Sequence, residues 1–202
     1  MTSTAPPIPG PAAVDAAQVA RQALRRCLLA DREQFAAGPE APAAHDALAA
    51  HLVRLLGEIE PERLGVYWPV RGEFNAIAAL EATGRSKLPL ALPYAQRQPP
   101  AMHFRAWNGQ APEVVDECGL PAPAAGPAVV PDVVLVPCVG YTRTGFRLGY
   151  GGGYFDRWLA RHPQVTAIGV AWSIGEIADD VFAPQAHDRP LMLVLTERGV
   201  VT

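Results

Sequence analysis

The sequence predicts an α/β fold, a single-domain layered sandwich in which a mainly parallel sheet is flanked by helices. Short continuous apolar runs, such as DVVLVP at 132–137 and VTAIGVA at 165–171, are typical of strands buried on both faces. These runs alternate with segments of helical periodicity, which favours parallel strands joined by helices. No long polar linker divides the 202 residues, so we expect one domain over residues 13–202.

The N-terminal region is predicted to be a leader followed by a helix. Residues 1–12 (MTSTAPPIPGPA) lack the basic start and apolar core of a signal peptide, and we expect a disordered leader there. Residues 14–35 have apolar side chains at three- and four-residue steps, as an amphipathic helix does. Arg21, Arg25 and Arg32 share another face of this helix.

The next hundred residues change from helix to mixed structure. A second helix is predicted over Ala43–Glu58, and the apolar run at 64–68 before Pro69 indicates a buried strand. Asn75 is a candidate N-cap for a helix that ends near Thr83. Residues 88–93 and 101–107 are predicted strands.

The last part of the chain has the clearest pattern. Proline, alanine and glycine dominate between Pro112 and Pro131, which predicts an extended surface connection. A buried strand at 132–137 is followed by a glycine-rich loop and a helix that starts near Tyr154. Two further buried strands are predicted at 165–171 and 191–196.

Composition limits the possible partners and compartment. The formal net charge is −3, so the chain lacks the basic excess of a nucleic-acid-binding protein. Cys27, Cys118 and Cys138 have no metal-ligand spacing and are expected to be reduced. No apolar run approaches the roughly 20 residues of a membrane span. These features favour a soluble cytoplasmic protein, and we expect a monomer.

The glycine-rich loop is the strongest candidate for a functional site. Residues 145–156 are GFRLGYGGGYFD, with glycines at Gly149 and Gly151–Gly153. Successive amide hydrogens in such a loop, followed by a helix N-terminus, can bind an anion, and Arg147 adds a forked donor suited to phosphate. The loop matches neither the P-loop nor the dinucleotide fingerprint. A tight turn without a ligand is the alternative.

The same region resembles a known family. RLGYGGGYFDR at 147–157 is similar to the signature of 5-formyltetrahydrofolate cyclo-ligases. In sequence order, four further segments are similar to parts of that family: VYWPVRGEFN at 66–75, MHFRAW at 102–107, IGVAW at 168–172 and AHDRPLMLVLTE at 186–197. The loop motif is specific, whereas the other segments carry weight through their order.

The resemblance implies an ATP- and Mg2+-dependent conversion of 5-formyltetrahydrofolate to 5,10-methenyltetrahydrofolate. In that scheme the formyl oxygen takes the terminal phosphoryl group, a folate nitrogen attacks the activated carbon, and phosphate leaves. Such chemistry depends on positioning and charge neutralisation. Two alternatives stay open: an ATP-dependent paralogue acting on another folate-like or thiamine-related substrate, and a non-catalytic nucleotide- or folate-binding regulator.

The resemblance also implies roles for particular residues. Arg147 and Tyr154 are the candidate catalytic residues. The candidate ATP-binding residues are Arg21, Arg25, Arg147, Leu148, Gly149, Tyr150, Gly151, Gly152, Gly153 and Tyr154. The candidate substrate-binding residues are Trp68, Glu73, Trp107 and Tyr154, and the candidate Mg2+ ligands are Asp156 and Asp188.

Each candidate also has a structural interpretation. Arg21 and Arg25 could belong to a solvated helix face, and Glu73 could be a glutamate in the first turn of a helix. Asp156 could cap a helix, and Asp188 could be a turn residue before Pro190.

Three positions depart from the family pattern. Thr142 and Met192 stand where aspartates are common, and Gly175 stands where a glutamine is usual. These departures permit a different substrate on the same fold.

Overall fold

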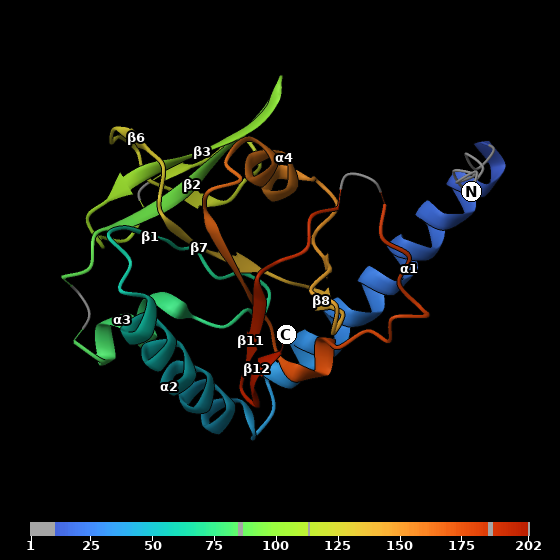
Figure 1. The fold of residues 1–202 in the computed structure, drawn as a ribbon, viewed down its shortest axis with the longest axis horizontal. Helices are drawn as coiled ribbons and strands as arrows, with labels where there is room; N and C mark the ends of the chain where they lie inside the picture. Colours follow the sequence, from blue (N-terminus) through green and yellow to red (C-terminus); the bar gives the residue numbers. More distant parts are fainter. Residues whose placement is uncertain (1–10, 85–86, 113, 186–187, 202) are drawn as a thin grey trace, which may run out of the picture.

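A mixed eight-stranded sheet forms the centre of the computed structural model, which describes residues 11–84, 87–112, 114–185 and 188–201. Its strand order is β12-β11-β10-β7-β1-β2-β3-β6 (Figure 1). From β11 to β2 neighbouring strands run parallel, whereas β12, β3 and β6 pair antiparallel at the edges. The expected α/β sandwich with a mainly parallel sheet is therefore confirmed.

The bounds of the elements are as follows. The helices are α1 (Pro11–Ala36), α2 (Ala41–Ile59), α3 (Ala76–Ala82) and α4 (Tyr154–Arg161), with a 3-10 turn η1 (Ser173–Gly175). The strands of the main sheet are β1 (Leu64–Gly65), β2 (Leu90–Arg97), β3 (Pro100–Trp107), β6 (Ala128–Val129), β7 (Val133–Pro137), β10 (Thr166–Val170), β11 (Leu193–Thr196) and β12 (Gly199–Val201). Two small hairpins are formed by β4 (Val114–Val115) with β5 (Pro121–Ala122), and by β8 (Gly140–Tyr141) with β9 (Arg147–Leu148).

Each face of the sheet has its own apolar layer. Successive side chains of a strand point to opposite faces, so Val133 and Leu135 of β7 pack on the α2 and α3 side, while Val134 and Val136 pack toward α4. Helix α2 contributes three fully buried leucines, Leu48, Leu52 and Leu56, at four-residue spacing. Figure 1 shows the two helical layers on opposite sides of the sheet.

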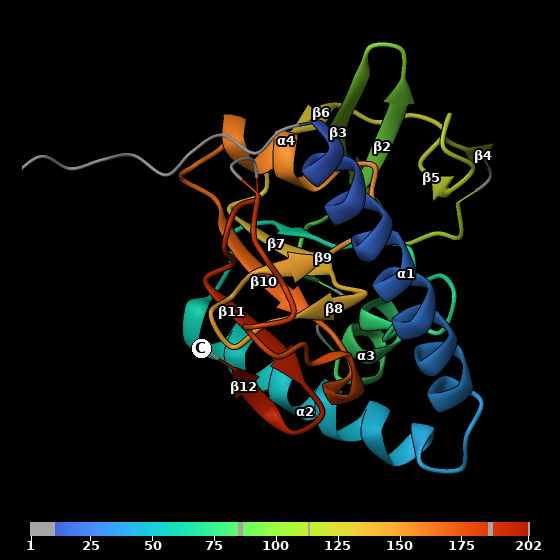
Figure 2. The same cartoon turned by 90° about the vertical axis from the view of Figure 1, so that its right-hand side faces the viewer.

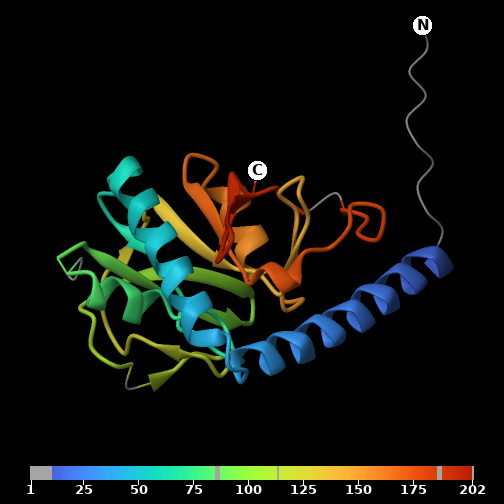
Figure 3. The same cartoon turned by 90° about the horizontal axis from the view of Figure 1, so that it is seen from below.

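Helix α1 packs against the β8–β9 hairpin rather than on the main sheet. Leu28 and Leu29 meet Val139, Leu148 and Ile177 in a third apolar cluster. Figure 2 shows α1 crossing in front of β8 and β9, and Figure 3 shows its first turns extending beyond the body of the molecule. This arrangement places one face of α1 beside the glycine-rich loop, which follows β9.

Several boundaries differ from the sequence-based expectation. Helix α1 begins at Pro11, so the last two residues of the predicted leader are helical, while residues 1–10 lie outside the described part of the chain. The strand expected at 64–68 spans only Leu64–Gly65, although the Val66 amide still donates to the Ala91 carbonyl at 2.9 Å. The expected surface connection at 112–131 contains β4, β5 and β6, and the last of these joins the sheet edge.

The capping prediction for α3 is confirmed. Asn75 is its N-cap, and the Asn75 side chain accepts a hydrogen bond from the Ala78 amide. Among the helices of the described residues, none is long and apolar enough to cross a membrane.

Candidate active site

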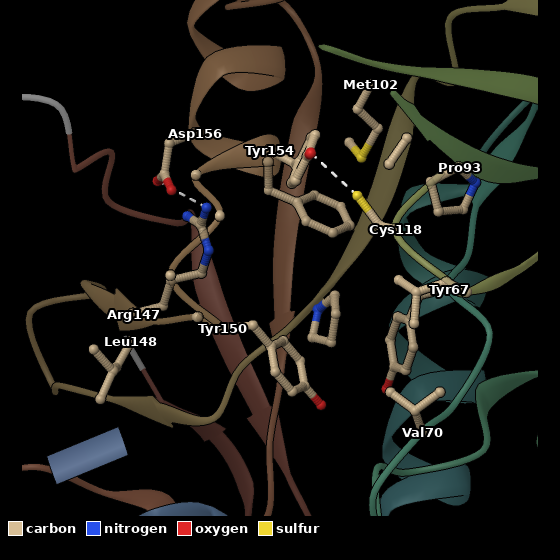
Figure 4. A pocket seen from close by; sticks show the side chains of 18 of the residues that line it. Tyr67, Val70, Pro93, Met102, Cys118, Arg147, Leu148, Tyr150, Tyr154 and Asp156 are labelled. Atoms are coloured by element: carbon tan, nitrogen blue, oxygen red, sulfur yellow. Dashed lines mark hydrogen bonds and ion pairs between the residues drawn. The ribbon is translucent and has the colours of Figure 1, made fainter. Parts of the chain in front are cut away.

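A cavity of about 770 Å³ opens at the carboxyl ends of the parallel strands (Figure 4). Tyr67 and Trp68, which follow β1, line it together with Pro137 at the end of β7 and Pro93 of β2. In open α/β sheets, ligands bind in the crevice outside the carboxyl ends of the strands. The cavity therefore lies where the fold favours a ligand.

The glycine-rich loop forms one wall of this cavity. Residues 149–153 all line it, between β9 and the start of α4. Gly151 has a φ of 97° and Gly153, the N-cap of α4, has a φ of 62°. These are left-handed conformations that favour glycine. The backbone thus turns sharply into α4 beside open space, as a phosphate-binding loop requires.

Arg147 enters the cavity beside this loop with part of its guanidinium unsatisfied. Its Nη2 donates to the Asp156 carboxylate at 2.7 Å. Its Nη1 is buried and has no hydrogen-bond partner among the described residues, and the whole residue is only 7% exposed. A buried donor without a partner costs free energy, so an anion at this point would be stabilised.

Two arginines of α1 reach the same wall. The Arg25 Nε donates to the Gly149 carbonyl at 2.6 Å, and Arg21 pairs with Asp188 at 2.9 Å. Burial, followed by the neighbouring charge of Arg21, lowers the pKa of the Arg25 guanidinium. A bound polyphosphate would offset both effects. The structure therefore brings all ten predicted ATP-binding residues to one cavity.

Glu73 lies across the cavity from the glycine-rich loop. Its side chain is 4% exposed, and its Oε1 accepts a hydrogen bond from the Tyr150 hydroxyl at 2.6 Å. Its Oε2 accepts from the Val70 amide at 2.9 Å. Burial raises the pKa of Glu73, and these hydrogen bonds oppose that rise. Helix α3 begins only at Ala76, so Glu73 is not a first-turn helix residue.

Part of the cavity lining is apolar. Tyr67, Val70, Pro93 and Met102 point toward the same space in Figure 4. Flat aromatic and apolar surfaces of this kind suit a planar ring system.

The two tryptophans predicted to bind substrate occupy different positions. Trp68 lines the cavity, whereas Trp107 is not among its lining residues. Trp107 packs edge-on against Trp68 with ring centroids 6.4 Å apart, and its indole donates to the Gln110 carbonyl. The direct contact of Trp107 with substrate thus has no support in this geometry, and the residue instead supports Trp68.

The two candidate metal ligands both line the cavity, each beside an arginine. Asp156 pairs with Arg147, and Asp188 accepts hydrogen bonds from Arg21 and from the Gln185 amide. The described residues contain no group of three or more potential ligands. Mg2+ commonly uses one or two carboxylates and completes its shell with phosphate and water. The residues present fit that mode rather than an all-protein metal cage.

The three departures from the family pattern lie outside the cavity lining. Thr142 is buried and its hydroxyl bonds within the β8–β9 turn, where it contacts Thr144 and the Phe146 amide. Gly175 is buried in η1, where an added Cβ would lie 3.1 Å from the Val139 carbonyl oxygen. Met192 is 65% exposed. None of the three therefore removes a group from the cavity surface.

Sequence reasoning missed three polar residues at the site. Arg32 is 4% exposed and contacts Tyr150 and Glu73, although its face on α1 was predicted from spacing. Asp116 holds a turn that presents Cys118, whose thiol lies 3.1 Å from the Tyr154 hydroxyl (Figure 4). Asp116 and Cys118 lie in the proline-rich connection, where no local pattern marks them.

The parallel sheet, the glycine-rich anion loop and the buried carboxylate facing it define an α/β enzyme with a two-ended ligand cavity. The family model for 5-formyltetrahydrofolate cyclo-ligases matches residues 17–197 of the chain. The chain therefore belongs to the 5-formyltetrahydrofolate cyclo-ligase family and is an enzyme.

Individual relatives agree with this assignment. A 5-formyltetrahydrofolate cyclo-ligase of Mycolicibacterium smegmatis is 33% identical over 147 residues, which cover 67% of this chain and 74% of the relative. The solved 5,10-methenyltetrahydrofolate synthetase of Aquifex aeolicus superimposes with a TM-score of 0.72 at 24% identity, over 89% of this chain and 91% of that one. The synthetase of Mycoplasma pneumoniae gives a TM-score of 0.68 at 20% identity, over 88% and 98% of the two chains. At these identities the two solved structures support the fold.

Proposed function

We propose that this chain converts 5-formyltetrahydrofolate and ATP into 5,10-methenyltetrahydrofolate, ADP and phosphate, with Mg2+. One observation carries the proposal: the unpartnered Arg147 Nη1 and the glycine-rich loop face the buried Glu73 carboxylate across a single cavity. An anion-binding end and a carboxylate end in one space suit a reaction between a polyphosphate and a reduced folate.

The nucleotide end would bind the triphosphate. The amides of the glycine-rich loop and the guanidinium groups of Arg21, Arg25 and Arg147 line that end. Arg147 is the most buried of the three arginines, and its charge would stabilise negative charge on the transferring phosphoryl group. Tyr154, at the first position of α4, also lines the cavity, and its hydroxyl lies 3.1 Å from the Cys118 thiol.

The folate end would orient the pterin. Glu73 can accept hydrogen bonds from the reduced ring, and Trp68 with Tyr67 offers aromatic surface beside it. The formyl oxygen would then lie near the terminal phosphate. After phosphoryl transfer, a neighbouring folate nitrogen attacks the activated carbon and phosphate leaves. The protein contributes position and charge rather than a nucleophile.

Asp156 and Asp188 would hold Mg2+ together with phosphate oxygens. When bound, the ion would neutralise charge on the β- and γ-phosphates. Asp156 is kept in place by Arg147, so the same side chain would position a metal ligand and contact the phosphate.

The first test is a direct assay. Because methenyltetrahydrofolate absorbs near-ultraviolet light distinctly, the protein with ATP, Mg2+ and 5-formyltetrahydrofolate should show growing absorbance. Reactions without ATP or without Mg2+ should show none. ATP hydrolysis only with another folate-like substrate would contradict the proposed substrate, and tight binding without hydrolysis would contradict catalysis.

The Arg147→Ala variant is expected to lose most of this activity. Removal of a preorganised donor costs about 2–4 kcal/mol of transition-state stabilisation, so kcat should fall steeply. Arg54→Ala is the matched control, because Arg54 is an exposed α2 arginine outside the cavity lining. Equal rates in the two variants would remove Arg147 from the active site.

We further propose that residues 13–202 act as a single-domain monomer in the cytoplasm, and that no nucleic acid or membrane takes part in its reaction. Residues of one chain line the cavity proposed for both substrates, which supports this proposal.

A further inference from the structure

Tyr150 connects the two ends of the cavity. It belongs to the glycine-rich loop, yet its hydroxyl donates to Glu73 Oε1 at 2.6 Å on the opposite wall. The same hydroxyl accepts a hydrogen bond from Nη2 of Arg32, which comes from α1. Figure 4 shows the Tyr150 ring between the Arg147 side and the Tyr67 side of the cavity. One hydroxyl thus joins three separate segments of the chain.

Arg32 is placed to serve this cluster. Its Nε donates to the Arg71 carbonyl at 3.0 Å, which fixes the guanidinium beside Glu73. Its Nη1 lies 3.6 Å from Glu73 Oε1 and has no hydrogen-bond partner in the described part of the chain. The guanidinium also lies near the Tyr150 ring, 5.5 Å from its centroid. Glu73 therefore depends on Tyr150 for its shortest side-chain hydrogen bond.

We propose that Tyr150 is a positioning residue that holds the Glu73 carboxylate in place for the folate and couples it to the glycine-rich loop. The inference rests on the proposed function, and it assigns to Tyr150 a role beyond nucleotide contact. Movement of the loop around a nucleotide would alter the carboxylate that receives the pterin. The two substrates would then influence each other's binding.

The charges around Glu73 predict a pH effect of known direction. Arg32 faces Glu73 from α1, Tyr150 from the glycine-rich loop, Tyr67 from the segment after β1 and Cys138 from the segment after β7. On its other side Glu73 borders a shallow hollow with His45 of α2, while the nearby Arg71 pairs with Glu33. Burial raises the pKa of Glu73, and the Tyr150 hydrogen bond is the strongest effect that lowers it.

The sign of the change follows from these effects. Protonation removes the negative charge of Glu73 and turns one of its two acceptor oxygens into a donor, which weakens its hydrogen bonds to the pterin. Activity should therefore fall as the pH drops through its pKa. Tyr150→Phe removes the donor that lowers this pKa. The acidic limb of the kcat/KM profile should therefore move to higher pH in the variant, whereas the rate well above the limb should recover much of its value.

The experiment compares wild type, Tyr150→Phe and Tyr94→Phe. Tyr94 is the matched control because it lies on β2 outside the cavity lining. At pH values on the acidic limb, we expect Tyr150→Phe to raise the KM for 5-formyltetrahydrofolate by about tenfold or more, the effect of losing a hydrogen bond to a charged group. The KM for ATP should change less, and Tyr94→Phe should resemble wild type.

A second readout needs no turnover. Carboxyl carbon NMR of the ligand-free protein, with Glu73→Gln to assign the Glu73 signal, should show Glu73 titrating at higher pH in Tyr150→Phe. If wild type turns over but Tyr150→Phe shifts neither the acidic limb nor the Glu73 titration, this inference alone is overturned. Absence of wild-type turnover would instead overturn the proposed function, and the positioning role with it.

Discussion

Buried arginines normally find partners for most of their five N–H donors. Arg147 is buried and its Nη2 donates to Asp156, but its Nη1 has no hydrogen-bond partner among the described residues, so its guanidinium is only partly hydrogen-bonded. Arg147 belongs to β9, a short strand of the β8–β9 hairpin, and its side chain lines the cavity. The Nη1 donor is therefore available to a ligand there. A phosphate oxygen is the partner that best completes such a group.

The glycines of the loop differ from one another at the residue scale. Gly151 has a φ of 97°, and a Cβ there would lie 3.3 Å from Arg25 Cζ. Gly149 has no positive φ, and a Cβ there would meet nothing within 4 Å. Gly151 is needed for its backbone conformation, whereas the missing side chain of Gly149 leaves space in the cavity.

The matched pair Gly151→Ala and Gly149→Ala separates these two needs. Gly151→Ala should cost about 1–2 kcal/mol because of its left-handed backbone, which lowers Tm by roughly 2–8 °C for a chain of this size. Gly149→Ala should leave Tm close to wild type. Both should raise the KM for ATP, because each methyl group enters the space proposed for phosphate.

Thermal melting and initial rates check this prediction. Equal Tm losses in the two variants would contradict the conformational argument. An unchanged KM for ATP in the stable Gly149→Ala variant would contradict phosphate binding at the loop.

At the scale of elements, the loop from Val70 to Asn75 is held between two fixed points. At its start the Val70 amide donates a hydrogen bond to the Glu73 carboxylate, and at its end Asn75 caps α3. Helix α3 has only seven residues and is held mainly by its buried side. Its start therefore determines where the preceding Glu73 lies.

Asn75→Ala should weaken this arrangement. Loss of an N-cap side chain costs about 1 kcal/mol, and the denaturation midpoint should fall accordingly. Because Glu73 precedes the cap by two residues, the KM for the folate should rise as well. Chemical denaturation and initial-rate measurements follow the two effects.

Two variants control this test. Asn75→Ser keeps a capping oxygen and should recover most of the stability. Asn108→Ala removes a similar side-chain contact, to the Gln110 amide, at an exposed site away from α3. A loss in Asn108→Ala as large as that in Asn75→Ala would show that the cap has no special weight.

At the scale of the whole molecule, the sequence predicted what depends on local pattern. Strands β7 and β10 were predicted from continuous apolar runs, and α2 was predicted from the regular spacing of its leucines. In both cases, residues near one another in the sequence indicate which side chains are buried. The glycine-rich loop was located for the same reason. The order of the strands in the sheet depends on contacts between residues far apart in the sequence. The short antiparallel edge strands β12 and β6 were therefore not predicted.

The cavity illustrates the same limit. Arg147 and Tyr154 were predicted from one motif, but Asp116 and Cys118 reach Tyr154 from a connection without a distinctive pattern. Trp107 was expected at the substrate because of its residue type, and only the fold shows that Trp68 lines the cavity whereas Trp107 packs against Trp68. Long-range packing decides which aromatic side chain faces the open space.

The two apolar layers share one sheet, which predicts a single folding unit. Leu52 of α2 is fully buried on one face, and Leu159 of α4 is buried on the other. Leucine-to-alanine changes in a core cost about 2–5 kcal/mol. Leu52→Ala and Leu159→Ala should therefore each lower Tm, by about 2–4 °C per kcal/mol, without splitting the transition.

Far-ultraviolet circular dichroism and tryptophan fluorescence provide the measurement. Trp158 lies in the α4 layer, whereas Trp107 and Trp172 lie in the α2 layer with Trp68 packed against it, so the summed fluorescence contains signal from both faces. Coincident transitions by both probes are expected in wild type and in each variant, because strands β7 and β10 contribute side chains to both layers. If one layer melted before the other in a variant, the two layers would be weakly coupled units. The cavity at the carboxyl ends of the strands would then be disrupted before the whole molecule unfolds.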